Sequence, residues 1–207
     1  MVAEGRENRT QKRLSRYRRS ETPPPLVLQG RDRQIVAAVA QHRLLTREQI
    51  ERLFFGTTTR ANFRLQKLYH HKLLGRLHLP TVRGSSQAIY FLDRQGVPVA
   101  AEALGVQPAA IPWKYKRREV GPLFLRHLLA VNDVRIAFEL AARSQKDHEL
   151  LLWLSDQEAR DEYSWGYGKK ALVPDAYGRY RFGDRVVSFF LELDQATVSA
   201  KRWAGKV

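Results

Sequence analysis

Two carboxylates are predicted to meet near the end of the sequence, in the stretch LVPDAYGRYRFGDRVVSFFLELD (172–194). Gly183-Asp184 suits a two-residue hairpin turn, and the resulting register places Asp175 opposite Glu192. Residues that face each other in a hairpin have Cβ atoms roughly 5 Å apart on one side of the sheet. The other side of the hairpin carries mainly apolar residues, so we expect that side to face the core.

A third acid, Asp194, lies two residues after Glu192 and points to the same side. Such a cluster repels itself unless a cation compensates, and Mg²⁺ binds one or two carboxylates together with water and phosphate oxygens. A metal there could activate water for phosphodiester cleavage. Asp175, Glu192 and Asp194 are therefore candidate catalytic residues, with Asp175 and Glu192 as metal ligands. The alternative is an exposed hairpin end whose acids pair with Arg179, Arg181 or Lys201.

The elements expected around this hairpin form a second, nuclease-like α/β domain over residues 123–207. Apolar spacing predicts a long helix from 123 to 144 and a buried strand at 148–155. His127 on this helix is interpreted as a satisfied core histidine. The polar segment after the strand is expected to be a loop with a helical turn. A final helix, ATVSAKRWAGKV (196–207), has no stop signal, so the domain is expected to be incomplete and the chain a fragment or a shortened relative.

The first half is predicted to contain three helices followed by a β-hairpin. Helical patterns cover residues 31–45, 46–55 and 58–74, and Thr46 with Gln49 forms a capping box for the second. Two strand-like runs then flank the turn-rich residues 83–86. This order is typical of a winged helix-turn-helix, which places its third helix in the DNA major groove. The candidate DNA-binding residues are Arg60, Arg64, Lys67, His71 and Arg83. The alternative is a protein-docking surface.

Charge and composition fit a nucleic-acid partner. The net charge is +15, and residues 1–105 carry 19 Lys and Arg against 8 Asp and Glu. Residues 1–25 are too polar to fold alone and are predicted to be a disordered basic arm, whose Arg13 and Arg16 are further DNA-binding candidates. The winged-helix domain is assigned to 26–105 and a linker to 106–122. The sequence has no cysteine and no apolar run that could span a membrane, so a cytoplasmic location is expected.

The acidic hairpin resembles the core of PD-(D/E)xK nucleases, in which the Asp and the Glu bind metal and a Lys two residues after the Glu assists the water. Asp175 and Glu192 match that pattern, but Asp194 stands where the lysine belongs. This departure implies an inactive nuclease relative. A displaced lysine is the alternative, and Lys201, Lys169 and Lys170 are the candidates for it.

The chain as a whole resembles the replication-relaxation family, which is related to plasmid mobilisation accessory proteins. The resemblance covers about residues 30–205 and is carried by LTREQIERLFF, RLQKLYHHKLLGRL, RHLLAVNDV, WLSDQEAR, LVPDAY and FLELDQAT. It implies a winged helix joined to a degenerate nuclease-like domain.

That resemblance also implies a function: binding double-stranded DNA in the replication, relaxation or transfer of plasmids and mobile elements, associated with the plasmid or nucleoid. Partners would be DNA and other replication or transfer proteins, with a homodimer possible. Two alternatives remain open. One is a Mg²⁺-dependent PD-(D/E)xK endonuclease, and the other is a winged-helix transcription regulator that dimerises on a palindromic site.

Overall fold

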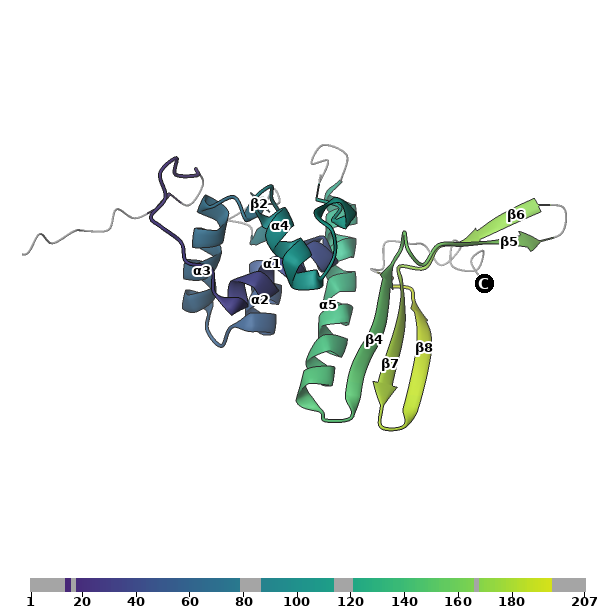
Figure 1. Ribbon diagram of the computed structural model, residues 1–207. Helices are drawn as coiled ribbons and strands as arrows, with labels where there is room; N and C mark the ends of the chain where they lie inside the picture. Colours follow the sequence, from purple (N-terminus) through teal and green to yellow (C-terminus); the bar gives the residue numbers. More distant parts are fainter. Residues whose placement is uncertain (1–13, 16–17, 79–86, 114–120, 166–167, 195–207) are drawn as a thin grey trace, which may run out of the picture.

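The computed structural model describes residues 14–15, 18–78, 87–113, 121–165 and 168–194, which form a mixed α+β fold (Figure 1). Its helices are α1 (Gly30–His42), α2 (Arg47–Phe54), α3 (Thr58–His70), α4 (Gly96–Leu104), the short 3₁₀ helix η1 (Pro108–Ala110) and α5 (Pro122–Ser144). Its strands are β1 (Leu44–Thr46), β2 (Leu74–His78), β3 (Ala88–Leu92), β4 (His148–Ser155), β5 (Asp161–Trp165), β6 (Gly168–Leu172), β7 (Ala176–Phe182) and β8 (Arg185–Leu191). None of the helices in these ranges is long and apolar enough to cross a membrane.

The first half has the predicted order of three helices and then two strands. Thr46 caps α2 by accepting a hydrogen bond from the Gln49 N–H, and the Gln49 side chain reaches back to the Thr46 N–H. Strand β3 pairs with β2 on one side and with β1 on the other, both antiparallel. The sequence did not predict β1, because three residues are too few to display an alternating pattern.

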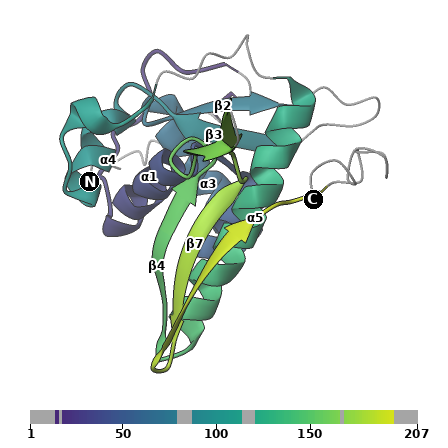
Figure 2. The same cartoon turned by 90° about the vertical axis from the view of Figure 1, so that its right-hand side faces the viewer.

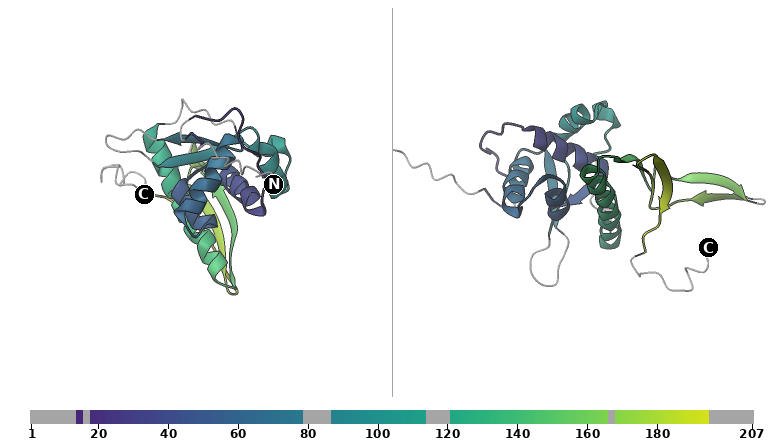
Figure 3. Two further views of the ribbon diagram at one scale, coloured as in Figure 1. Left: turned by 90° about the vertical axis from the view of Figure 1, so that its left-hand side faces the viewer. Right: turned by 90° about the horizontal axis from the view of Figure 1, so that it is seen from below.

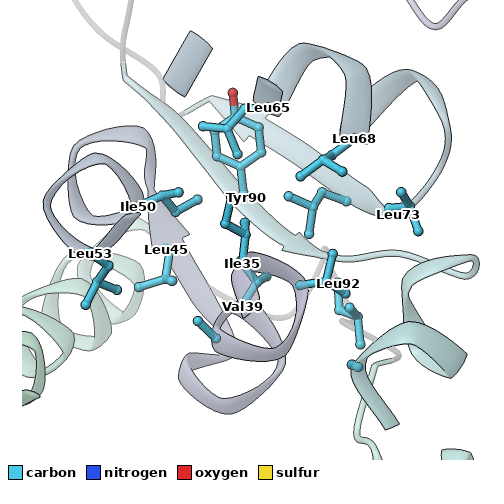
Figure 4. Close-up of a cluster of buried hydrophobic side chains, with 14 of the residues drawn as sticks. Ile35, Val39, Leu45, Ile50, Leu53, Leu65, Leu68, Leu73, Tyr90 and Leu92 are labelled. Atoms are coloured by element: carbon cyan, nitrogen blue, oxygen red, sulfur yellow. The ribbon is translucent and has the colours of Figure 1, made fainter. Parts of the chain in front are cut away.

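One hydrophobic core holds this half together (Figure 4). Ile35 from α1, Ile50 from α2 and Leu65 from α3 are fully buried in it. Ile136 from α5 is also fully buried in the same cluster. The core therefore crosses the sequence-predicted boundary at residue 123, and α5 is anchored to the first half.

Helix α5 lies between that half and the sheet β4-β7-β8 (Figures 1 and 2). On the α5 side, the Phe138 ring stacks on Phe189 with centroids 4.9 Å apart and also contacts Trp153 and Tyr180. Gly178 makes this contact possible, since a Cβ there would lie 2.3 Å from the Phe189 ring. Strand β4 is half-buried, not buried as the sequence predicted, because α5 covers only one face of the sheet.

The register predicted for the β7–β8 hairpin is confirmed. Phe182 pairs with Arg185 and Ala176 with Leu191, which is the alignment set by a two-residue turn at Gly183-Asp184. Gly183 has a φ of 56°, a left-handed conformation that glycine adopts readily. The expected core side is buried at Ala176 and Tyr180, whereas Phe182 at the tip is 37% exposed.

The polar segment after β4 differs from its prediction. Residues expected to form a loop with a helical turn instead form the antiparallel hairpin β5–β6, which projects away from α5 (Figure 3). All described positions of β6 are exposed, so no hydrophobic face marked these strands in the sequence. The helix predicted at 196–207 lies outside the described residues.

The described part of the N-terminal arm lies along α3. The Gln66 side chain donates to the Leu14 carbonyl, and the His71 ring contacts the Pro24 carbonyl at 2.9 Å. Arg19 donates to the Leu74 carbonyl and to Asp93. These polar contacts hold residues 14–15 and 18–25, which the low apolar content had led us to expect as disordered.

Candidate functional site

Asp175 lies at a bend directly before β7 and has specific hydrogen-bond partners. Its Oδ1 is 2.8 Å from Nε2 of His127, which projects from the first turns of α5. Its Oδ2 accepts a hydrogen bond of 2.7 Å from the Leu193 N–H. The Asp175 and His127 side chains are 21% and 33% exposed, so the pair is only partly shielded from water.

The other two acids of the predicted cluster, Glu192 and Asp194, are exposed beyond the end of β8. The regular ladder stops at Ala176 and Leu191, with one further bond from the Asp175 N–H to the Leu191 carbonyl. Within the described ranges, no three His, Cys, Asp or Glu side chains are grouped so that they could hold a metal ion. The side-chain partner of Asp175 on α5 is thus a histidine, and the metal role expected for Asp175 and Glu192 stays a prediction.

The lysines considered as substitutes lie on β6 or outside the described residues, and their role stays a prediction. Lys169 and Lys170 lie on exposed β6 and pair with Ser164 and Tyr163 of β5 in the projecting hairpin. Lys201 lies outside the described residues. The position two residues after Glu192 remains occupied by an acid, Asp194.

His127 is the site residue that sequence reasoning missed. It was interpreted as a core histidine, but its ring meets a carboxylate 48 positions further along the chain. Periodicity carries no information about such a contact. The only signal was that RHLLAVNDV and LVPDAY both belong to the motifs on which the family resemblance depends.

The His127–Asp175 pair borders a cavity of about 510 Å³ between α1, α4, α5 and β4. The lining includes the aromatic residues Trp113, Phe124 and Trp153. The polar lining includes Arg43, which lies directly after α1. Ligand pockets typically measure roughly 300–1,000 Å³ and combine apolar walls with a few polar groups, as this cavity does.

A buried polar network forms the back of this cavity. Nδ1 of His42 is 2.9 Å from the Ala38 carbonyl, and Nε2 is 3.3 Å from Oε1 of Glu139. Arg135 also donates to Glu139. Burial lowers the pKa of His42, although the Glu139 carboxylate opposes this shift. Burial alone would raise the pKa of Glu139, but its contacts with His42 and Arg135 lower it below its ordinary value.

The predicted DNA-binding residues of α3 divide into two groups. Arg64 donates to both carboxylate oxygens of Asp32, which is fully buried, and to the Val27 carbonyl. His71 is bonded to the arm. By contrast, Arg60 is exposed, and Lys67 extends over the Phe63 ring, which is itself 57% exposed. Arg60, Phe63 and Lys67 therefore form an open basic and aromatic stripe, named here the α3 stripe. Arg13, Arg16 and Arg83 lie outside the described residues.

Comparison with known proteins gives one family. Searches of curated proteins and of solved structures gave no significant match. The family model described as Replication-relaxation matches residues 36–207. That range includes α2, α3, His127 and Asp175, and it covers most of the chain. The chain therefore belongs to the replication-relaxation family.

Proposed function

We propose that this protein binds double-stranded DNA in the replication, relaxation or transfer of plasmids or other mobile elements. Membership of the family indicates a role in replication or relaxation. The net charge of +15 supports a polyanionic partner. Further partners would be other proteins of replication or transfer, and a homodimer would suit a palindromic DNA site.

The arrangement of the first half supports a winged helix-turn-helix. Helices α2 and α3 are followed by the hairpin β2–β3, and β1 completes the small sheet. In such folds the third helix enters the major groove. The α3 stripe fits that role, because Arg60 and Lys67 could contact phosphates or base edges while Arg64 holds the fold together.

The second half supports an inactive relative of the PD-(D/E)xK nucleases. Helix α5 followed by β4, β7 and β8 places Asp175 at the start of the middle strand. The proposal of an inactive nuclease rests on the hydrogen bonds of Asp175. His127 contacts one carboxylate oxygen, and the Leu193 N–H donates to the other. These hydrogen bonds satisfy each Asp175 oxygen without a metal, and Asp194 stands where the nuclease pattern has the lysine that would assist the water.

Incubation of supercoiled and linear DNA with the protein and Mg²⁺ or Mn²⁺ tests the absence of nuclease chemistry. We expect retarded but uncut DNA for the wild type and for Asp175→Ala alike. Cutting that requires the metal and is lost in Asp175→Ala would establish the endonuclease instead.

Duplex affinity of the double variant Arg60→Ala/Lys67→Ala tests the binding surface in the same samples. Arg160→Ala is the matched control, since Arg160 is exposed and paired with Glu162 next to β5, away from α3. We expect weaker binding for the α3 variant and wild-type affinity for the control. Equal affinities for all three proteins would exclude the α3 stripe.

A further inference from the structure

Arg43 has the most strained backbone among the non-glycine residues that line the cavity. It follows α1 with φ 66° and ψ −47°, a region that residues with a Cβ rarely adopt. Strain of this kind persists only where the surrounding structure enforces it, and it is concentrated at binding and catalytic sites.

Asn132 enforces the strained turn at Arg43. Its Nδ2 donates to the His42 carbonyl at 3.1 Å and to the Leu44 carbonyl at 2.7 Å, the carbonyls on either side of Arg43. Asn132 is only 4% exposed, so both bonds are sheltered from water. One buried amide of α5 thus fixes the direction in which the Arg43 side chain leaves the backbone.

That direction brings the guanidinium to the cavity. Its NH1 lies 3.4 Å from Oδ1 of Asp156, a long contact, and its Cζ lies 6.0 Å from the centroid of the Phe124 ring. The side chain keeps 28% of its surface exposed. With these weak contacts, Arg43 has donors left for a ligand, whereas Arg135 nearby is committed to Glu139 and to the Gln41 carbonyl.

Other residues that line the cavity are suited to contact the base of a nucleotide, as Arg43 is suited to contact its phosphate. Trp113, Phe124 and Trp153 offer aromatic faces on which a base can stack. His42, which is 2% exposed, lines the same cavity, and its Nε2 lies 3.3 Å from Oε1 of Glu139.

We infer that the cavity binds one deoxynucleoside monophosphate unit, with its phosphate on Arg43 and its base against one of the lining aromatic residues. Arginine suits this role because its planar fork of N–H donors matches a phosphate. The unit has two possible sources with the same chemistry, a free nucleotide or the 5′-phosphorylated end of a single strand. This inference goes beyond the proposed function, since it concerns a second site away from the α3 stripe.

Isothermal titration calorimetry of the whole protein tests the site with four probes: the deoxynucleoside monophosphates, inorganic phosphate, a 5′-phosphorylated oligothymidylate and the same oligonucleotide without the phosphate. We expect saturable binding of a monophosphate and weaker binding of inorganic phosphate. If the ligand is a strand end, the phosphorylated oligonucleotide binds more tightly than the free nucleotide. Absence of binding by every nucleotide probe, or equal affinity for nucleotide and inorganic phosphate, would overturn the inference.

Variants at Arg43 separate a ligand contact from a structural role. Arg43→Ala should weaken nucleotide binding about tenfold or more, because a hydrogen bond to a charged group is lost. Arg43→Gly should weaken it equally while raising the melting temperature, since glycine relieves the positive φ. Arg160→Ala should change neither property. Nucleotide affinity unchanged in both Arg43 variants would contradict the assignment.

Duplex binding keeps this test independent of the proposed function. Arg43→Ala should leave duplex affinity unchanged, and Arg60→Ala/Lys67→Ala should leave nucleotide affinity unchanged. If the proposed function is wrong, the wild type will show no duplex binding for Arg60→Ala/Lys67→Ala to weaken, whatever its nucleotide affinity. Failure of the nucleotide site would leave duplex binding intact.

Discussion

Arg60 and Arg64 lie one helical turn apart on α3, yet they have different environments. Arg60 is exposed, whereas the Arg64 side chain is 13% exposed and its guanidinium forms an ion pair with the fully buried Asp32. The Asp32 carboxylate also accepts a hydrogen bond of 2.6 Å from the Gln29 N–H at the start of α1. The Arg64–Asp32 pair therefore joins α3 to α1, and sequence spacing alone could not distinguish it from the neighbouring exposed arginine.

Arg64→Ala is expected to lower the free energy of unfolding by about 3 kcal/mol, because a buried carboxylate loses its paired cation. Arg60→Ala should change it by less than about 0.5 kcal/mol, as is usual for surface substitutions. Urea unfolding followed by circular dichroism measures both. Equal stability of the two variants would show that Arg64 is not a structural residue.

The acid pair of the hairpin illustrates what sequence can and cannot specify about a site. The two-residue turn at Gly183 fixed the register, so the position of Asp175 opposite the end of β8 was predictable. Its partner was not, because His127 comes from a helix whose approach depends on tertiary packing. Arg43 was missed for a related reason, since its strain is imposed by Asn132, which is 89 positions away along the chain.

Residues 14–15 and 18–28, named here the strap, lie along α3 and contact one histidine, His70. The His70 ring is 2% exposed, and its Nδ1 accepts a hydrogen bond of 2.9 Å from the Ser20 N–H. On the other side, Nε2 lies 3.2 Å from the Ser15 carbonyl, so it must donate. Only the neutral ring can accept at one nitrogen and donate at the other.

Acidification is therefore expected to loosen the strap. Burial lowers the pKa of His70 below 6.5, and the positive charges of Arg76 and Arg19, with His71, lower it further, while the Ser15 carbonyl opposes this. Because the unfolded chain then binds the proton more tightly, the stabilisation is present above pH 6.5 and is lost as the pH falls below it.

Hydrogen exchange of the Ser20 amide measures the loosening. Its protection should fall between pH 7.5 and pH 5 after correction for intrinsic exchange rates. The Phe55 amide, which donates to the Glu51 carbonyl at the end of α2, is the internal control and should stay protected. Unchanged protection of Ser20 at pH 5 would mean that His70 does not hold the strap.

The elements differ in how far their sequences specify them. Helices α1, α2, α3 and α5 follow the apolar spacing of their sequences, and Thr46 caps α2. Hairpin β5–β6 and strand β1 were not predicted, because the hairpin is exposed at its described positions and β1 is only three residues long. The ordered strap was missed because carbonyl and side-chain hydrogen bonds leave no compositional signal.

The molecule as a whole joins a basic first half to the sheet β4-β7-β8, and Asp175, Glu192 and Asp194 flank the β7–β8 hairpin of that sheet. Helix α5 links the two parts, since Ile136 is buried in the first core while Phe138 packs on the sheet. The described α3 stripe and the cavity beside Asp175 lie on different elements of this frame. The proposed binding of duplex DNA by the α3 stripe therefore requires no chemistry at the cavity.

The salt dependence of duplex affinity is the most direct test of DNA binding through the α3 stripe. Each phosphate contact contributes a slope of about −0.9 to log K against log salt. We expect a steep negative slope for the wild type and Arg160→Ala, and a shallower one for Arg60→Ala/Lys67→Ala. A flat dependence, or the same slope in all three proteins, would contradict it.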